Sequence, residues 1–396
     1  MREQWWKNSL TGILCLYFLT LSLFPSALDG LKIAIGALAA AGLWHRYLDR
    51  KFLLDPVLLA TLAYAAIALL SNLAGSGRMA DSLKILSWTL PFILGKAYSQ
   101  YHSEQLNKTL ILGAAFLAAY MAVALALSID GLDQISALKY SQHYLILTFR
   151  HITRTAIFVA VAGLICVYAL LYCRETSVRL LAWPGIAILL PTLILTGRRM
   201  TVAAFLAVSA LLLLYRKKYL ILGIGLAVTV LGILVLGQAK RFDLNPERLQ
   251  KTQSVVERRT VWYAGWQIFK DNPILGSGFG SFKEEAKPHV EEYRSTHPNH
   301  TKHENLEDAH NIILHVAAET GIIGVAAMLF IFFFSIWSGW SRRLSHPAAL
   351  CLSACCMLIF MNSQLHVHLY ASNMHGFLFL LMGMTSGIAP NLEAFR

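Results

Sequence analysis

Long apolar runs recur along this 396-residue chain and constrain its fold more than any other feature. A helix rises ~1.5 Å per residue, so a run of about twenty residues spans the ~30 Å hydrocarbon core of a membrane. The composition agrees, since 56% of the residues are hydrophobic and 14% are charged. The runs are unbroken and lack the period-two alternation of a transmembrane barrel strand. The sequence therefore predicts an all-α polytopic membrane protein.

Twelve runs have the character of transmembrane helices. They cover residues 9–28, 31–48, 53–74, 82–99, 107–128, 155–173, 178–197, 200–215, 219–237, 310–337, 347–365 and 373–390. The first resembles a signal peptide, with Arg2 and Lys7 before its apolar core, but we expect an uncleaved first span. The chain then divides into transmembrane helices 1–9 over residues 1–237, one large loop subdomain over 238–309, and transmembrane helices 10–12 over 310–396.

Basic residues predict the orientation, because Lys and Arg concentrate in cytoplasmic loops. If the N-terminus is cytoplasmic, every cytoplasmic segment carries Lys or Arg, as at Arg46, Arg216 and Arg342. We therefore predict that both termini are cytoplasmic and that 238–309 lies on the opposite side. That loop has eleven basic and eleven acidic residues, which excludes a nucleic-acid-binding patch. The net charge of +12 reports topology rather than an acidic partner.

Some arginines fall on the non-cytoplasmic side, against the topology rule. They are the pair Arg150 and Arg154, the pair Arg198 and Arg199, and the arginines of the long segment 238–309, among them Arg258 and Arg259. Each pair taken singly is also explained by contact with lipid headgroups. Arginine is suited to bidentate contact with phosphate, so the pairs taken together favour a phosphate site at the membrane surface. A pyrophosphate there needs either a metal or a cluster of cations, and the arginines are the better candidates.

The tenth run opens with Asp308-Ala309-His310-Asn311, and its histidine lies at the wet end of the expected helix. Asp308 is placed to cap that helix. A lone interfacial histidine is usually no more than a polar residue near water, but beside the arginines His310 is a candidate general base. Gly321 and Gly324 further along would let another helix pack closely.

Two other clusters invite a binding interpretation that the spacing does not favour. His297, His300 and His303 flank Pro298 and have no cysteine nearby, which matches no standard zinc pattern, so we expect a mobile polar loop and no metal site. The glycines at 276, 278 and 280 follow no predicted strand, which favours a flexible turn over a phosphate cradle.

Glu319 is costly at membrane depth unless it is paired, and His315 four residues earlier is the expected partner.

These motifs resemble the O-antigen ligase (WaaL) family and the related polymerases and O-oligosaccharyltransferases of the Wzy_C superfamily. His310-Asn311, nine further residues and then Gly321-x-x-Gly324 looks like the family signature. The sequence Leu195-Thr-Gly-Arg-Arg199 is similar to its first essential arginine site. Arg199 is the closer match there, and family members more often carry Ser or Thr at the position of Arg198.

The second essential arginine site of the family is similar to Arg258-x-x-x-Trp262 followed by Asn272-Pro-x-x-Gly-x-Gly278. Arg150 and Arg154 resemble, more weakly, a basic pair that ligases place beside the lipid phosphates. The resemblance is strong over roughly residues 195–325 and elsewhere rests on span count and length.

The resemblance implies a C-type (GT-C) glycosyltransferase fold in the bacterial inner membrane, with the active site on the periplasmic face. The expected reaction transfers O-polysaccharide from undecaprenyl pyrophosphate to a sugar hydroxyl of lipid A–core, with inversion and with no cofactor, metal or nucleotide. His310 would deprotonate the acceptor, while Arg199 and Arg258 would hold the pyrophosphate. The residues expected to contact substrate are Arg150, Arg154, Arg198, Arg259 and Asn311.

Three alternatives stay open. An O-antigen polymerase of the superfamily usually has more than one long periplasmic loop. A protein O-oligosaccharyltransferase usually carries a C-terminal soluble domain. A lipid-linked glycan transporter or flippase would need charged groups at mid-membrane and a repeat between its halves, and the sequence shows only Glu319 and no such repeat.

Overall fold

The computed structural model describes residues 2–23, 28–45, 47–48, 50–127, 152–225, 253–297, 306–344, 346–365 and 372–388, with residues 227, 231 and 367 in isolation. Every regular element in these ranges is a helix, which confirms the all-α class. The helices are α1 (Arg2–Leu23), α2 (Leu28–Trp44), α3 (Arg50–Leu53), α4 (Pro56–Ala74), α5 (Met79–Lys84), α6 (Thr89–Tyr101), α7 (Leu106–Leu127), α9 (Ile152–Tyr172), α10 (Thr176–Leu195), α11 (Arg199–Tyr215), α14 (Gln253–Asp271), α15 (Phe282–Thr296), α16 (Ile312–Ser341), α17 (Pro347–Ser363) and α18 (Ser372–Gly387), with 3₁₀ turns η2 (Ile85–Trp88) and η3 (Ser103–Gln105).

Five helical stretches in the described residues are long and apolar enough to cross a membrane. They are Pro56–Ala74, Ser103–Ala124, Ile152–Tyr172, Thr176–Leu195 and Ile312–Ser341. Shorter apolar helices cover Gly30–Trp44, Arg199–Tyr215 and Pro347–Ser363. The expected run 82–99 is not one helix, because α5, η2 and α6 follow one another there. The expected run 219–237 lies mostly outside the described residues, so the total of twelve spans stays a prediction.

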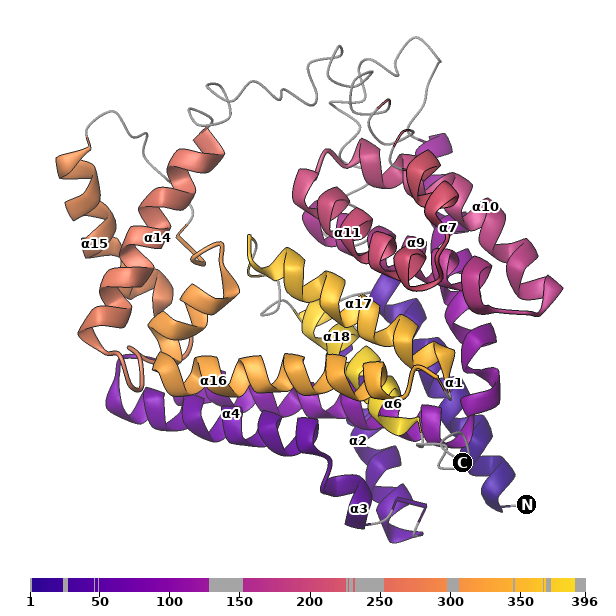
Figure 1. Ribbon diagram of the computed structural model, residues 1–396. Coiled ribbons are helices and arrows are strands. Elements are labelled where there is room, and N and C mark those ends of the chain that lie inside the picture. The colour runs from indigo at the N-terminus through magenta and orange to yellow at the C-terminus, as the bar shows by residue number, and fades with distance from the viewer. Residues whose placement is uncertain are drawn as a thin grey trace.

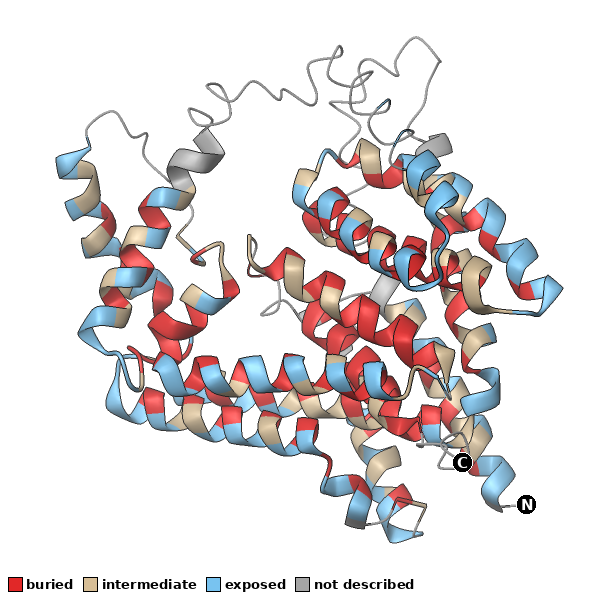
Figure 2. Ribbon diagram, in the orientation of Figure 1, coloured by how far each residue is buried: buried red, intermediate tan, exposed pale blue. Residues whose placement is uncertain are grey.

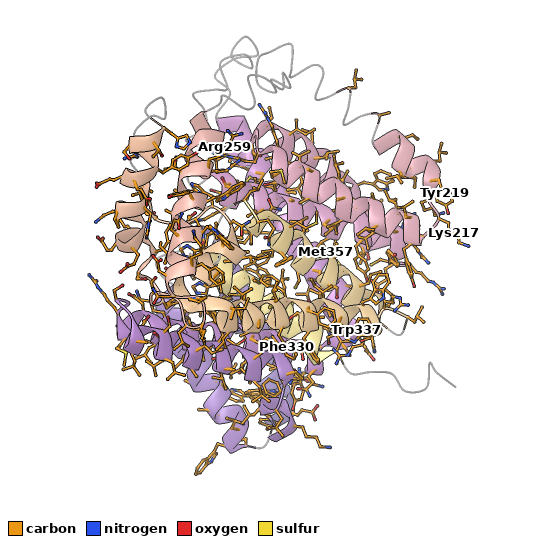
Figure 3. All side chains as sticks on the ribbon, turned by 60° about the vertical axis from the view of Figure 1, so that its left-hand side comes forward. Lys217, Tyr219, Arg259, Phe330, Trp337 and Met357 are labelled. Atoms are coloured by element: carbon orange, nitrogen blue, oxygen red, sulfur yellow. The ribbon has the colours of Figure 1, made fainter. Side chains whose placement is uncertain are left out.

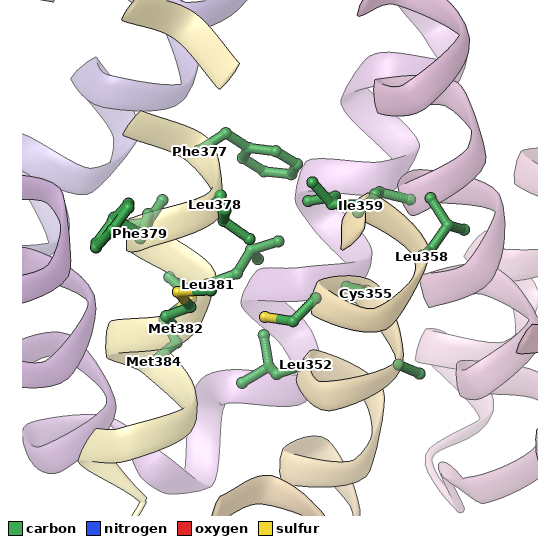
Figure 4. Packing of buried hydrophobic residues seen from close by; sticks show 14 of the residues in the cluster. Leu352, Cys355, Leu358, Ile359, Phe377, Leu378, Phe379, Leu381, Met382 and Met384 are labelled. Carbon is green, nitrogen blue, oxygen red and sulfur yellow. The ribbon is translucent and has the colours of Figure 1, made fainter. Parts of the chain in front are cut away.

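The centre of the bundle is an apolar core around α17 and α18, which are buried along most of their length (Figure 2). Phe377 and Leu381 of α18 lie beside Cys355 and Ile359 of α17 (Figure 4). α6 packs on the other side of α18, where an added Cβ at Gly383 would lie 2.1 Å from the backbone oxygen of Phe92. The two backbones therefore approach too closely for any side chain at that position.

One end of the bundle collects basic side chains. Arg342 after α16 donates to the Thr385 carbonyl oxygen of α18 at 2.9 Å, and Arg216 after α11 donates to the Leu171 carbonyl oxygen of α9 at 2.9 Å. Lys96 and Asp55 form a buried ion pair at 2.8 Å. Ser386, the residue after Thr385, donates to the Asp55 carboxylate, so this ion pair lies at the same end of the bundle. These contacts join the helix ends that the distribution of basic residues predicts to be cytoplasmic.

At the opposite end, α14 and α15 pack on the first turns of α16 (Figure 1). Their shared apolar cluster consists of Ala264, Ile268, Phe282, Ala286, Val290, Ala309 and Ala318. The described part of the expected loop subdomain is therefore helical and shares its core with the tenth predicted span. Residues 238–252 and 298–305 of that subdomain lie outside the described ranges.

α16 is interrupted at Gly321, whose backbone is left-handed with φ 64°. The interruption leaves backbone groups without partners inside the helix, and the turn after α14 supplies them. Ser277 and Gly278 donate their N–H groups to the carbonyl oxygens of Ala318 and Glu319, each at 2.9 Å, and the N–H of Ile322 donates to the Pro273 carbonyl oxygen at 2.9 Å. Without these partners the buried polar groups would destabilise the helix.

The connection between α4 and α5 completes the same junction. The N–H of Ser76 donates to the Ser277 carbonyl oxygen at 2.8 Å, and the hydroxyl of Ser71 donates to the Glu319 carbonyl oxygen at 2.6 Å. We name this meeting of residues 71–78, 273–280 and 318–322 the glycine junction. The glycines form a turn as expected, but this turn is hydrogen-bonded to two other backbone segments, at residues 71–78 and 318–322.

The two signature glycines have different roles in this arrangement. A Cβ at Gly321 would lie 2.1 Å from the Ile274 carbonyl oxygen, so Gly321 faces the turn after α14 and not another helix. Gly324 does face a helix, since its Cβ would lie 3.6 Å from the ring of Tyr64 in α4. α4 and α16 run side by side beyond this point (Figure 1).

The glycine junction predicts the effect of a single methyl group. Gly321→Ala should destabilise the protein by more than the ~1–3 kcal/mol of a strained backbone, because the added Cβ also collides with the turn. Gly113→Ala in α7 is the matched control, since its Cβ meets no atom within 4 Å, and it should stabilise the helix slightly. The measurement is the midpoint of thermal unfolding of both purified variants. Equal midpoints would contradict this account of the junction.

The arrangement of the two ends predicts accessibility across the membrane. Ser295 is exposed on α15, and Leu344 is exposed at the basic end after α16. In a background without native cysteines, Ser295→Cys should react with a membrane-impermeant thiol reagent added from the periplasmic side. Leu344→Cys should react only after the inner membrane is disrupted. The reverse pattern would show that the orientation is wrong.

Candidate active site

The histidine of the signature lies in the loop just before α16. The helix begins at Ile312, and Asn311 is its N-cap, with its side-chain oxygen accepting the N–H of Leu314 at 2.9 Å. The expectation that Asp308 caps the helix is wrong, because Asp308 lies four residues before the first helical residue. His310 is half-buried and has a left-handed backbone with φ 50°, a conformation that residues other than glycine seldom adopt.

Asp308 is in direct contact with His310. Its Oδ1 accepts the backbone N–H of His310 at 2.7 Å and lies 2.9 Å from the ring Nδ1 of the same residue. Burial by itself would raise the pKa of Asp308, but the hydrogen bonds and charge of His310, together with the charge of His315, lower the pKa below its usual range. The carboxylate is therefore the charged form at neutral pH.

A second acid and histidine lie buried beneath this loop. The Nε2 of His315 lies 3.4 Å from Glu319 Oε1, which confirms the expected partner of Glu319. The same Oε1 accepts the N–H of Phe282 at 3.3 Å, at the first residue of α15. On its other side, the Nδ1 of His315 accepts the N–H of Ala309 at 3.4 Å. Glu319 and His315 thus connect the start of α15 to the residue that precedes His310.

Two arginine sites predicted from the sequence are close enough to interact electrostatically. Arg198 is the N-cap of α11 and is half-buried. Burial lowers the pKa of its guanidinium, and the charge of Arg258 on α14 lowers it further. Two segments that are sixty residues apart in the chain therefore bring like charges together. That arrangement is favourable where an anion lies between the charges.

Arg258 and His310 lie toward the same end of two adjacent helical segments. α14 and the first turns of α16 run side by side (Figure 1), and a Cβ at Gly265 would lie 3.1 Å from Leu314. Arg258 is seven residues before Gly265, or ~10 Å along the helix axis, and His310 is four residues before Leu314. Arg258 and His310 therefore both lie farther from the glycine junction than the contact between Gly265 and Leu314.

The other candidate residues are distributed around this region. Arg199 is the first residue of α11 and is half-buried, and Arg154 is half-buried in the first turn of α9. Arg259 is exposed on α14 (Figure 3). Arg150 lies outside the described residues. α9 and α11 pack against each other, and Arg216 after α11 reaches Leu171 near the end of α9, so the starts of both helices are also at one end of the bundle.

Sequence reasoning assigned Asp308 to the wrong task. Its i, i+2 spacing from His310 is the signal that could have indicated contact, because aspartate commonly hydrogen-bonds the backbone two residues later. Within the described ranges, no group of three or more His, Cys, Asp or Glu side chains is arranged to hold a metal ion. His300 and His303 of the histidine-rich loop are outside those ranges.

Comparison with known families matches this region of the chain. The Wzy_C family model, described as O-antigen ligase, matches residues 184–329. The match extends from within α10 to the middle of α16 and includes both arginine sites, the glycine junction turn and the His310 loop. No curated protein matches the chain. The region from α10 to the middle of α16 is therefore similar to the O-antigen ligase family, within a multi-pass helical membrane protein.

Proposed function

We propose that this protein is an O-antigen ligase of the inner membrane. It transfers O-polysaccharide from undecaprenyl pyrophosphate to a sugar hydroxyl of lipid A–core on the periplasmic face. The observation that carries the proposal is the proximity of Arg198 and Arg258, on the same side of the molecule as His310. This proximity supports an anion-binding site beside a candidate base, at the end of the bundle opposite to the basic cytoplasmic layer.

The arginines bind the leaving group. Guanidinium groups can each form two parallel hydrogen bonds to phosphate oxygens, and their charge offsets the charge that develops as the pyrophosphate departs. Arg258 is assigned this role together with the Arg198 and Arg199 pair. The family resemblance favours Arg199, whereas the electrostatic interaction with Arg258 favours Arg198. Arg150, Arg154 and Arg259 are assigned to the lipid phosphates and the glycan nearby.

His310 is the proposed general base. It accepts the proton of the acceptor hydroxyl as the acceptor oxygen bonds to the anomeric carbon of the donor. The bond from that carbon to the pyrophosphate oxygen breaks on the opposite face, so the configuration inverts. Undecaprenyl pyrophosphate leaves as an anion held by the arginines. Asn311 is assigned to substrate contact through its amide N–H groups, because its oxygen already caps α16.

The polymerase and oligosaccharyltransferase alternatives use the same family region, and they differ in the acceptor. The transport alternative is weaker. Glu319 is the deep acid that a transporter would need to expose to its cargo, but its Oε1 contacts both His315 and the start of α15. Those contacts give Glu319 a structural task in holding the candidate site together.

Lipopolysaccharide gels distinguish these activities. A strain lacking this protein should lose its ladder of O-polysaccharide and retain the lipid-linked polymer. The wild-type gene should restore the ladder, and His310→Ala should not, although it is present in the membrane at the wild-type amount. Lipopolysaccharide capped with a single repeat would indicate a polymerase. An unchanged ladder in the deletion strain would contradict both activities.

Lysine substitutions test the role of the arginines. Arg198→Lys, Arg199→Lys and Arg258→Lys keep the charge and lose the planar fork, so the variants at the binding positions should transfer glycan more slowly than wild type. Arg179→Lys at the start of α10 is the matched control, because it lies at the opposite end of that helix. The measurement is transfer in vitro with purified donor and acceptor. Wild-type rates in all three would mean that these arginines act only as surface charge.

A further inference from the structure

We propose that Asp308 is the positioning residue that fixes the imidazole of His310, so that Nε2 is the nitrogen that takes the acceptor proton. This inference rests on the proposed function, in which His310 is the base. It assigns to Asp308 a task other than the helix capping expected from the sequence, and it identifies the reacting atom of the histidine.

The backbone turn is the first observation that supports this role. The Asp308 Oδ1 accepts the N–H of the residue two positions later, which is an Asx turn. The turn bends the chain so that His310 adopts its left-handed backbone, a strained conformation for a residue other than glycine. Such strain persists only where neighbouring contacts enforce it. Here it brings the ring back to the carboxylate that forms the turn.

The ring contact is the second observation. His310 Nδ1 lies 2.9 Å from Asp308 Oδ1, and a charged carboxylate can only accept hydrogen bonds. In a neutral ring, a hydrogen on Nδ1 avoids opposing the lone pair of that nitrogen to the carboxylate, and this tautomer leaves the lone pair on Nε2. The N–H direction is not well aligned with that oxygen here, and catalytic hydrogen bonds are often poorly aligned until substrate binds.

The buried pair beneath the loop is the third observation. Ala309 stands between the acid and the histidine, is fully buried, and donates its N–H to His315. His315 in turn contacts Glu319, which is held at the start of α15. The Asx turn is therefore anchored on its inner side, and the backbone of the loop that carries His310 cannot shift without breaking buried contacts.

The carboxylate also has a consequence during transfer. As the acceptor oxygen bonds to the anomeric carbon, its proton moves to Nε2 and the ring becomes positively charged. The negative charge of Asp308 at Nδ1 stabilises that imidazolium, as an acid does behind other catalytic histidines. The electron pair of the breaking bond leaves with the pyrophosphate, so Asp308 keeps its own charge throughout.

Asp308→Asn separates the turn from the charge, because an asparagine oxygen can form the same Asx turn. We expect this substitution to lower kcat by ~10²-fold or more. In the serine-protease triad, the same change of aspartate to asparagine behind the catalytic histidine lowers kcat by ~10⁴-fold. The KM for the donor should be unchanged, since the arginines bind it. Glu307→Gln is the matched control at the exposed neighbouring acid and should behave as wild type. Asp308→Glu, which keeps the charge on a longer side chain, should recover part of the rate.

A double-mutant cycle then shows whether Asp308 acts through His310. Asp308→Asn combined with His310→Ala should be no slower than His310→Ala alone, because the acid has no ring to position. Additive losses, or a wild-type rate in Asp308→Asn, would overturn this inference and leave the proposed base intact. Normal transfer by His310→Ala would instead overturn the base assignment and the inference with it. Thermal unfolding of each variant confirms that rates are compared between folded proteins.

Discussion

The hydrogen bonds between the turn after α14 and the interrupted α16 are the interaction on which the rest of this structure depends. A break inside a buried helix is tolerated only where other groups satisfy its backbone, and residues 273–278 do so at Ala318, Glu319 and Ile322. The break redirects α16, so that its first turns pack with α14 and α15 while the remainder runs beside α4 (Figure 1). The glycine junction therefore fixes the positions of the Arg258 helix and the His310 loop together.

Charge is organised differently at the two ends of the bundle. At one end the basic side chains are engaged with protein groups, as Lys96 is with Asp55 and Arg342 is with the last turn of α18. At the other end, Arg258 is near enough to Arg198 to disfavour the charge of Arg198. Such proximity destabilises a protein by itself, and an anionic substrate between the two groups would offset that cost. The outer face of α16, with exposed Phe330 and Trp337, suits contact with lipid tails (Figure 3).

Much of the fold could be predicted because apolar runs report membrane helices directly. The described helices correspond to most of the expected runs. The candidate site was predictable only in part. Arg198, Arg258 and His310 were identified as candidate residues because of their side-chain chemistry. The proposed role of Asp308 depends on a backbone turn that is visible only in the structure. Gly321 was assigned to helix packing because sequence spacing cannot show that a helix breaks and receives a turn.

The sequence by itself determined the class of the protein, the positions of its apolar helices and the identity of its basic and titratable residues. These follow from local properties, since hydrophobic length and residue chemistry do not depend on distant contacts. Only the tertiary structure decided which of those residues meet. Ser277 reaches Ala318, and Arg198 reaches Arg258, across long stretches of chain. Such pairings depend on the summed packing of many helices and on backbone groups that every residue shares, so side-chain sequence does not encode them locally.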